Sequence, residues 1–233
     1  MMVDSSSGKK RKRSGSLGKG RAFSGPRMRD GRFVSGGQGA APRSYGIRSL
    51  TEPGFVDVAD TGYVLDTTGT ITLLNTVPQG AGTSQRVGKK IMLKSLEFHG
   101  KAQGNGSANY NYCSILIIYD KRPTGTLPGI TDVLNSASPL SFNNDANSDR
   151  FETLKRHDFE LIGNATDYTA ISARRLDFYL PLRGRPEVFK AAGTGAIGDI
   201  SEGAIYQITI GSVAAGTGAA NLDGGFRLRY VDV

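Results

Sequence analysis

The sequence predicts an all-β protein: a single eight-stranded antiparallel jelly roll, a form of β-sandwich, that follows a disordered basic N-terminal arm. The chain holds eight or nine short runs rich in β-branched and aromatic residues and no amphipathic helix of normal length. Glycine, at 32 of 233 residues, is about twice its usual frequency and lies mainly between these runs, as in a protein with many turns. Residues 51–233 match the size of one sandwich.

The arm, residues 1–50, differs sharply in charge from the rest of the chain. It holds four Lys and eight Arg against two Asp, a net charge of +10. Because the whole chain carries +8, the remaining 183 residues carry −2. The arm is too poor in apolar residues to offset the entropy of ordering its backbone. Its dense, uniform charge indicates a polyanionic partner. The residues expected to bind nucleic acid are Lys9, Lys10, Arg11, Lys12, Arg13, Lys19, Arg21, Arg27, Arg29, Arg32, Arg43 and Arg48.

The run Lys9–Arg13 also fits a short basic nuclear localisation signal and predicts a nuclear import receptor as a partner. Further along the arm, Phe23, Phe33 and Tyr45 lie between the arginines. Cations that neutralise phosphates and rings that stack on unpaired bases are typical of single-strand binding without sequence preference.

The body begins after a turn at Pro53–Gly54. Phe55–Ala59 and Tyr63–Leu65 are predicted as short strands, and Gly69–Leu74 as a firmer one because it is rich in β-branched residues. The Pro and Gly content of Asn75–Gly82 indicates a loop.

A long strand is predicted next, over Val87–Ala102. Its alternation places one apolar set on each face. The two sets are Met92, Leu96 and Phe98 on one face, and Ile91 and Leu93 on the other.

Tyr110–Asp120 predicts an interior strand, because Cys113–Tyr119 is apolar on both faces and needs cover on both sides or a subunit contact. A loop at Lys121–Gly129, a helical turn at Thr131–Asn135 and a polar loop at Ser141–Asp149 are expected to follow.

Phe151–Ile162 permits a turn of helix and then a strand, and strand is favoured from about Leu154. Ala173–Leu182 alternates as a strand, and its Pro181 indicates an edge position. The last predicted strands are Glu187–Lys190, Ala204–Val213 and Gly225–Val233.

In the final strand, Phe226, Leu228 and Tyr230 alternate with Arg227 and Arg229, the pattern of a half-buried strand. The two arginines could contact nucleic acid or pair with acidic side chains at a subunit contact. A second candidate set of nucleic-acid contacts lies at the start of an earlier strand: Arg86, Lys89, Lys90 and Lys94.

Nothing in the sequence indicates an enzyme, a metal site or a cofactor. Cys113, the single cysteine, is expected to be a buried, inert thiol. His99 and His157 lack metal-ligand or catalytic spacing and are interpreted as surface or sheet histidines. The oxygen-rich loop around Asp145 could hold a hard cation, but a solvated turn is favoured because the EF-hand spacing is absent. No run reaches the length of a membrane span, so no membrane insertion is expected.

Three stretches carry a resemblance to a known family. Leu73–Gly100 resembles the pattern LN-x-PQG-x-G-x-x-QR-x-GKK-I-x-x-KS-L of capsid proteins from small circular single-stranded DNA viruses that encode a replication initiator, the geminivirus-like branch. Ile115–Leu134 resembles the family's YD-x-x-P-x-G-x-x-P-x-x-x-D-x-L segment, and Asn147–Arg156 its RF-x-x-L stretch. The three stretches occur in the family's order.

The resemblance implies a capsid protein that self-assembles, as about 60 copies in a T=1 icosahedral shell, around a circular single-stranded DNA genome. The virion and the host nucleus are then the expected locations, and the import receptor is the host's. Two alternatives stay open, because phosphate neutralisation does not distinguish DNA from RNA. One is a coat protein that packages RNA, as in satellite viruses; the other is a non-viral nuclear nucleic-acid-binding β-sandwich.

Overall fold

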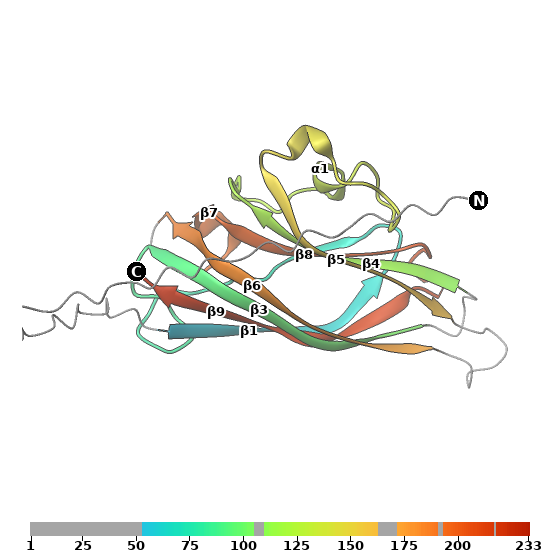
Figure 1. Cartoon of the computed structure of the whole chain (residues 1–233), viewed down its shortest axis with the longest axis horizontal. Coiled ribbons are helices and arrows are strands. Elements are labelled where there is room, and N and C mark those ends of the chain that lie inside the picture. Colours follow the sequence, from blue (N-terminus) through green and yellow to red (C-terminus); the bar gives the residue numbers. More distant parts are fainter. Residues whose placement is uncertain (1–52, 105–109, 163–171, 191–192, 217) are drawn as a thin grey trace, which may run out of the picture. The chain divides into compact units, whose positions relative to one another are not determined.

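The computed structural model describes residues 53–104, 110–162, 172–190, 193–216 and 218–233, all within one compact unit of the chain. Two antiparallel sheets face each other in this unit (Figure 1). The five-stranded sheet has the order β1-β9-β3-β6-β7, and the four-stranded sheet has the order β2-β8-β4-β5. The strands are β1 Pro53–Leu65, β2 Thr70–Leu73, β3 Lys90–Gln103, β4 Tyr110–Asp120, β5 Phe151–Ile162, β6 Ala173–Phe189, β7 Ile200–Glu202, β8 Ala204–Gly211 and β9 Ala220–Asp232.

The strand pairing is nested. β1 pairs with β9, β2 with β8, β3 with β6 and β4 with β5, so the chain resembles one long hairpin rolled onto itself. This pairing defines a jelly roll of eight strands, to which the three-residue β7 adds a ninth at the edge of β6. The predicted fold class is confirmed.

The core lies between the two sheets and is built from the apolar side of the alternating strands. The rings of Phe98 and Phe226 are buried in it and pack with the partly buried ring of Phe178, with centroids 4.4 to 6.2 Å apart. In β9, Phe226, Leu228 and Tyr230 are buried, as the alternation predicted.

The predicted division of β3 into two apolar faces is wrong. Ile91 and Leu93 are buried together with Leu96 and Phe98. Lys94 is an extra residue in the ladder, because Leu93 pairs with Tyr230 of β9 and Ser95 with the adjacent Arg229. This bulge changes the parity of the strand, so side chains on either side of it point to the same core.

On β6 the opposing irregularity is larger. Its partner residues jump from Arg185 to Pro181 at the same point, and Arg183 and Gly184 adopt positive φ values of 55° and 76°. Glycine adopts this conformation at little cost. The candidate strand Glu187–Lys190 is therefore the continuation of β6 beyond the irregularity. Pro181 does lie on an edge, since only Val188 and Phe189 of β6 pair with β7.

Two other regions are more continuous than predicted. β1 joins Phe55–Ala59 and Tyr63–Leu65 in one strand, with a register shift between Asp60 and Tyr63. Phe151–Ile162 is a strand throughout, without a helical turn.

The four-stranded sheet is covered on both faces along much of β4 and β8. Every residue of β4 from Cys113 to Asp120 and every residue of β8 is buried, which confirms the prediction of an interior strand. The segment 121–150, which includes the short helix α1 (Ile130–Val133) and a 3-10 turn at Asp145–Asn147, lies over the outer side of this sheet (Figure 1).

Candidate nucleic-acid-binding surface

The twelve cations of the arm, including the run Lys9–Arg13, lie outside the described residues. Their assignment to nucleic acid and to nuclear import therefore stays a prediction. The described candidates are Arg227, Arg229 and the set at the start of β3.

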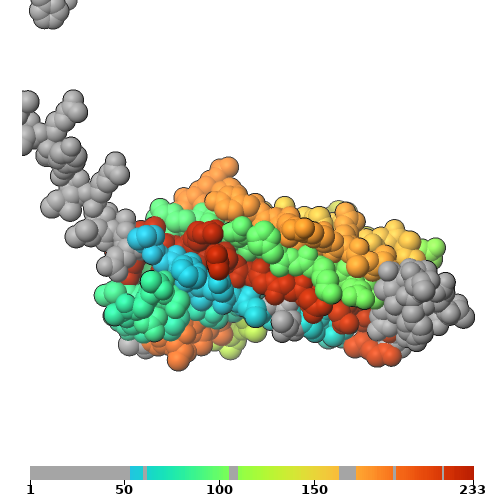
Figure 2. Space-filling model, turned by 90° about the horizontal axis from the view of Figure 1, so that it is seen from below, coloured from blue at the N-terminus to red at the C-terminus, as the bar shows by residue number. Residues whose placement is uncertain are grey.

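Arg227 and Arg229 lie on the outer face of the five-stranded sheet. Figure 2 shows this face, on which β1, β9, β3 and β6 form neighbouring bands in strand order. Both arginines are exposed, because they alternate with the buried residues of β9.

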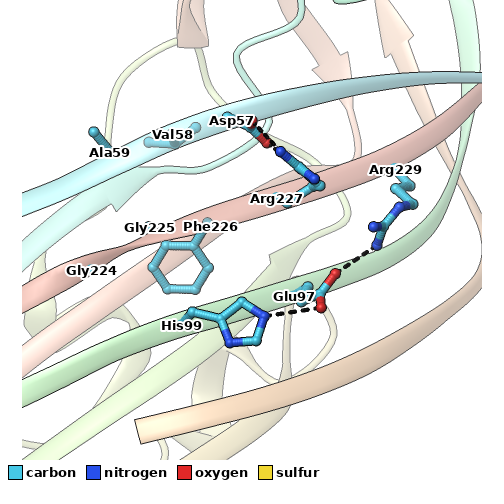
Figure 3. Close-up of a pocket in the computed structure, with 10 residues that line it drawn as sticks. All are labelled: Asp57, Val58, Ala59, Glu97, His99, Gly224, Gly225, Phe226, Arg227 and Arg229. Atoms are coloured by element: carbon cyan, nitrogen blue, oxygen red, sulfur yellow. Dashed lines mark hydrogen bonds and ion pairs between the residues drawn. The ribbon is translucent and has the colours of Figure 1, made fainter. Parts of the chain in front are cut away.

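Each of these arginines is paired with a carboxylate of the same chain (Figure 3). Arg227 Nε and Nη2 donate to the two oxygens of Asp57 at 2.7 Å each, from directly across β1. Arg229 Nη1 donates to Glu97 Oε2 on β3 at 2.7 Å. The guanidinium of Arg227 lowers the pKa of Asp57, and that of Arg229 lowers the pKa of Glu97. The acidic partners of these arginines therefore lie within the subunit, and not at a subunit contact as the second alternative placed them.

A hollow of about 500 Å³ opens beside these pairs (Figure 3). Gly225 lies in its floor, between Ala59 of β1 and His99 of β3, and has no side chain to fill the space. Around it the charges of Arg227 and Arg229 are matched by those of Asp57 and Glu97, and His99 adds a positive charge only when it is protonated. The hollow offers hydrogen-bonding groups at a small apolar floor but no arginine or lysine in excess of its carboxylates for a phosphate.

His99 completes this network. Its Nε2 lies 3.0 Å from Glu97 Oε1 and its Nδ1 lies 3.1 Å from Asp177 Oδ1. Hydrogen bonds to these carboxylates, Glu97 first, raise the pKa of His99 above its usual value. His157 behaves oppositely: burial, together with the charges of Arg174 and Lys155, lowers its pKa.

We expect the two histidines to titrate separately, with His99 protonating at the higher pH. The raised pKa of His99 means that its ion pairs stabilise the fold below pH 6.5 and that this contribution is lost as pH rises through the folded-state pKa. Imidazole resonances of the dissociated full-length chain, followed against pH, measure both values. Glu97→Gln should lower the pKa of His99 and leave that of His157 in place; coincident titrations in the parent chain would contradict the network.

The candidate cations at the start of β3 differ in exposure, since the three lysines are exposed and Arg86 is buried. Lys89, Lys90 and Lys94 are exposed, and within the described chain no carboxylate lies at ion-pair distance from any of them. These three lysines can reach a phosphate.

Arg86 is not available as a nucleic-acid contact, so the prediction for this residue is wrong. Its side chain is fully buried, with the guanidinium carbon 3.7 Å from the centre of the Phe189 ring and Nη1 donating to Gly88 O at 2.7 Å. Burial lowers the pKa of Arg86, while the nearby Glu187 opposes the shift. Phe189 and Glu187 belong to β6, which is distant in sequence, so no local sequence pattern predicts the burial of Arg86 against them.

Side chains of the polar loop Ser141–Asp149 attach it to the part of the same connection that precedes it. Asn144 Nδ2 donates to Thr131 O at 2.9 Å and Asn147 Nδ2 donates to Asp132 O at 2.8 Å. Asp149 forms an ion pair with Arg122. In the part of the chain that the structure describes, no group of three His, Cys, Asp or Glu residues is placed to hold a metal ion.

Cys113 is buried in β4, as predicted, and burial raises the pKa of its thiol to about 12. The thiol is therefore neutral at physiological pH, which makes it a poor nucleophile. Among the described residues, no helix is long and apolar enough to cross a membrane.

The sequence as a whole matches the model of the geminivirus coat protein/nuclear export factor BR1 family over residues 4–233. The chain belongs to this family. The resemblance to geminivirus-like capsid proteins is thereby confirmed, and the family supports a viral coat protein.

Two curated relatives agree. The chain is 28% identical over 168 residues to a capsid protein of Miscanthus streak virus (isolate 91), covering 62% of this chain and 64% of that protein. It is 34% identical over 113 residues to a coat protein of Maize white line mosaic Satellite virus, covering 47% of this chain and 52% of that protein. The chain thus spans about half to two thirds of the length of these relatives.

Similarity to solved structures is weak. The Desmodium yellow mottle tymovirus structure matches with 9% identity and a TM-score of 0.29 over 78% of this chain and 90% of that chain. The infectious bursal disease virus Gx strain matches with 10% identity and a TM-score of 0.32 over 76% of this chain and 32% of that chain. The jelly-roll assignment rests on the strand order of the chain itself.

Proposed function

We propose that this coat protein self-assembles into a small icosahedral shell and packages a circular single-stranded DNA genome through its N-terminal arm. The observation that carries the proposal is the division of charge, +10 on residues 1–50 against −2 on the rest. In a shell of about 60 copies the arms would supply on the order of 600 positive charges to neutralise phosphates.

The charges of the described body are consistent with the arm as the main binding site for phosphates. Its charged arginines are largely matched by its own carboxylates, so they add little to phosphate binding. Those with a carboxylate within 4.0 Å are Arg122, Arg150, Arg156, Arg175, Arg185, Arg227 and Arg229. The exposed lysines at the start of β3 are among the described cations that have no carboxylate at ion-pair distance and could add to phosphate binding.

Recombinant full-length protein mixed with circular single-stranded DNA should form uniform closed shells, visible by negative-stain microscopy and light scattering. The shells should protect the DNA from nuclease. A protein that stays monomeric across salt concentration and pH would contradict the shell and favour a nuclear nucleic-acid-binding β-sandwich.

The similarity to a satellite-virus coat protein keeps RNA as the second candidate cargo. Nucleic acid extracted from particles that were purified from cells supplying both DNA and RNA distinguishes the two: extracted cargo that resists RNase and is degraded by DNase supports DNA. Cargo degraded only by RNase would show that the packaged genome is RNA. The proposal that the protein forms a shell would be unaffected.

We further propose that Lys9–Arg13 directs the protein to the host nucleus by binding an import receptor before assembly. Five consecutive cations in an extended segment are the form such receptors recognise. Residues 1–32 fused to a fluorescent protein should accumulate in the nucleus. Replacing these five residues by alanine should abolish accumulation, whereas replacing Arg27, Arg29 and Arg32 should leave it unchanged. Equal loss of nuclear accumulation in both variants would mean that the import receptor recognises total charge and not this run.

A further inference from the structure

The connection between β4 and β5 exposes two large apolar side chains that are two residues apart in sequence. Leu140 is 73% exposed and Phe142 is 82% exposed, more than any other large apolar residue that the structure describes. Single exposed apolar residues are common, but two bulky ones in one loop mark a contact surface.

The loop that carries them is held in place from below. Arg156 of β5 donates from Nη1 to Ser141 O at 2.7 Å and from Nη2 to Pro139 O. The guanidinium is itself oriented by Asp158, which accepts from Arg156 Nε at 2.9 Å. On the other side, Asn135 N donates to Phe142 O at 3.0 Å. Leu140 and Phe142 are thus presented by a fixed backbone, which reduces the entropy lost on binding.

The composition of the loop favours a protein partner over a nucleic acid. The ten residues Asn135–Asn144 contain no charged side chain, although 21% of the chain is charged. A surface that binds phosphates carries cations, whereas the centre of a protein–protein contact is depleted of charge and enriched in aromatic residues.

The same chain offers a matching surface. Tyr110 of β4 lies directly opposite Ile162 of β5, and Tyr112 lies two residues further on the same face. All three are exposed, at 58%, 48% and 47% respectively. By strand alternation they share the outer face with Arg156, so this apolar surface and the loop lie at different ends of the same two strands.

We propose that Leu140 and Phe142 are the apolar anchors of a contact between copies of this chain, and that Tyr110, Tyr112 and Ile162 of a second copy receive them. The inference rests on the proposed self-assembly and names the surfaces that carry it. The two surfaces differ, so the loop of one copy can bind one neighbour while its β4–β5 surface binds the loop of a second neighbour. Both contacts can also be made with the same neighbour.

The test is assembly of the full-length double variant Leu140→Ser/Phe142→Ser. Its thermal unfolding should match that of the parent chain, because neither side chain is buried. The protein concentration at which shells form should rise at least about tenfold. Val87→Ser, which removes another exposed apolar side chain, is the matched control and should assemble as the parent does.

A photo-crosslinking phenylalanine analogue at position 142 identifies the occupant. Crosslinks in assembled shells should map to peptides that contain Tyr110, Tyr112 or Ile162 of another copy. Unchanged assembly of the double variant, or crosslinks only to other surfaces or to a non-coat protein, would overturn the inference. A parent chain that itself fails to assemble would instead contradict the proposed function.

Discussion

Deleting residues 1–32 is expected to remove most of the salt-dependent binding of single-stranded DNA. The arm holds twelve cations, of which the deletion removes ten. If ten cations engage phosphates, the logarithm of the affinity should fall with the logarithm of salt concentration with a slope of about −7. The parent chain should then lose about 10⁴-fold in affinity between roughly 50 and 200 mM salt, and the deleted chain about tenfold or less.

Fluorescence anisotropy with a labelled oligonucleotide, repeated over a salt series, measures both slopes. The matched control keeps the arm and replaces Lys89, Lys90 and Lys94 by alanine, which should reduce the slope by about 2 at most. The deleted chain should still unfold cooperatively, because none of the removed residues belongs to the described sandwich. An unchanged slope after the deletion would place the binding site in the body and refute packaging by the arm.

Asp120→Ala is expected to be among the most destabilising single substitutions in the chain, at about 3–5 kcal/mol. Asp120 is fully buried at the end of β4 and accepts hydrogen bonds from three other parts of the fold. Arg150 donates from Nε at 3.0 Å and Nη2 at 2.8 Å, Arg122 N donates at 3.0 Å and Tyr206 Oη of β8 donates at 3.2 Å. Its removal leaves a partly buried guanidinium and a buried hydroxyl without this acceptor.

The midpoint of thermal unfolding should fall by about 10 °C or more, as measured by calorimetry on the dissociated full-length chain. Asp149→Ala is the control. Its ion pair with Arg122 lies in the same connection but is exposed, so its loss should change stability by less than about 1 kcal/mol. Similar effects of the two substitutions would mean that Asp120 does not organise the junction between β4 and the segment over the sheet.

Most strands could be predicted because their signal is local. In β9 each apolar residue alternates with a polar one, and the structure buries one set and exposes the other. The run Cys113–Tyr119 was recognisable as an interior strand because it is apolar throughout. The faces of β3 could not be predicted in this way, because the bulge at Lys94 is defined by the pairing of β3 with β6 and β9.

The candidate surface divides in the same way. The charge of the arm and the exposure of Lys89, Lys90 and Lys94 follow from short stretches of sequence. The sequence analysis did not identify Asp57 and Glu97 as the partners of the arginines on β9. Strand alternation does place Glu97 and His99 on one face. Asp57 lies 170 residues from Arg227, and no pattern within either strand links them.

Composition and alternation along the chain were thus enough to predict an all-β body and a strongly cationic arm, because charge density and strand period are properties of neighbouring residues. The family came from the resemblance of three short stretches to known capsid-protein motifs. Which of the body's cations remain free depended on the folded sandwich. Arg227 pairs with Asp57, Arg229 with Glu97, and Arg86 is buried under Phe189. These outcomes are set by sheet register and side-chain packing between distant strands, which bring together groups that the linear sequence keeps apart.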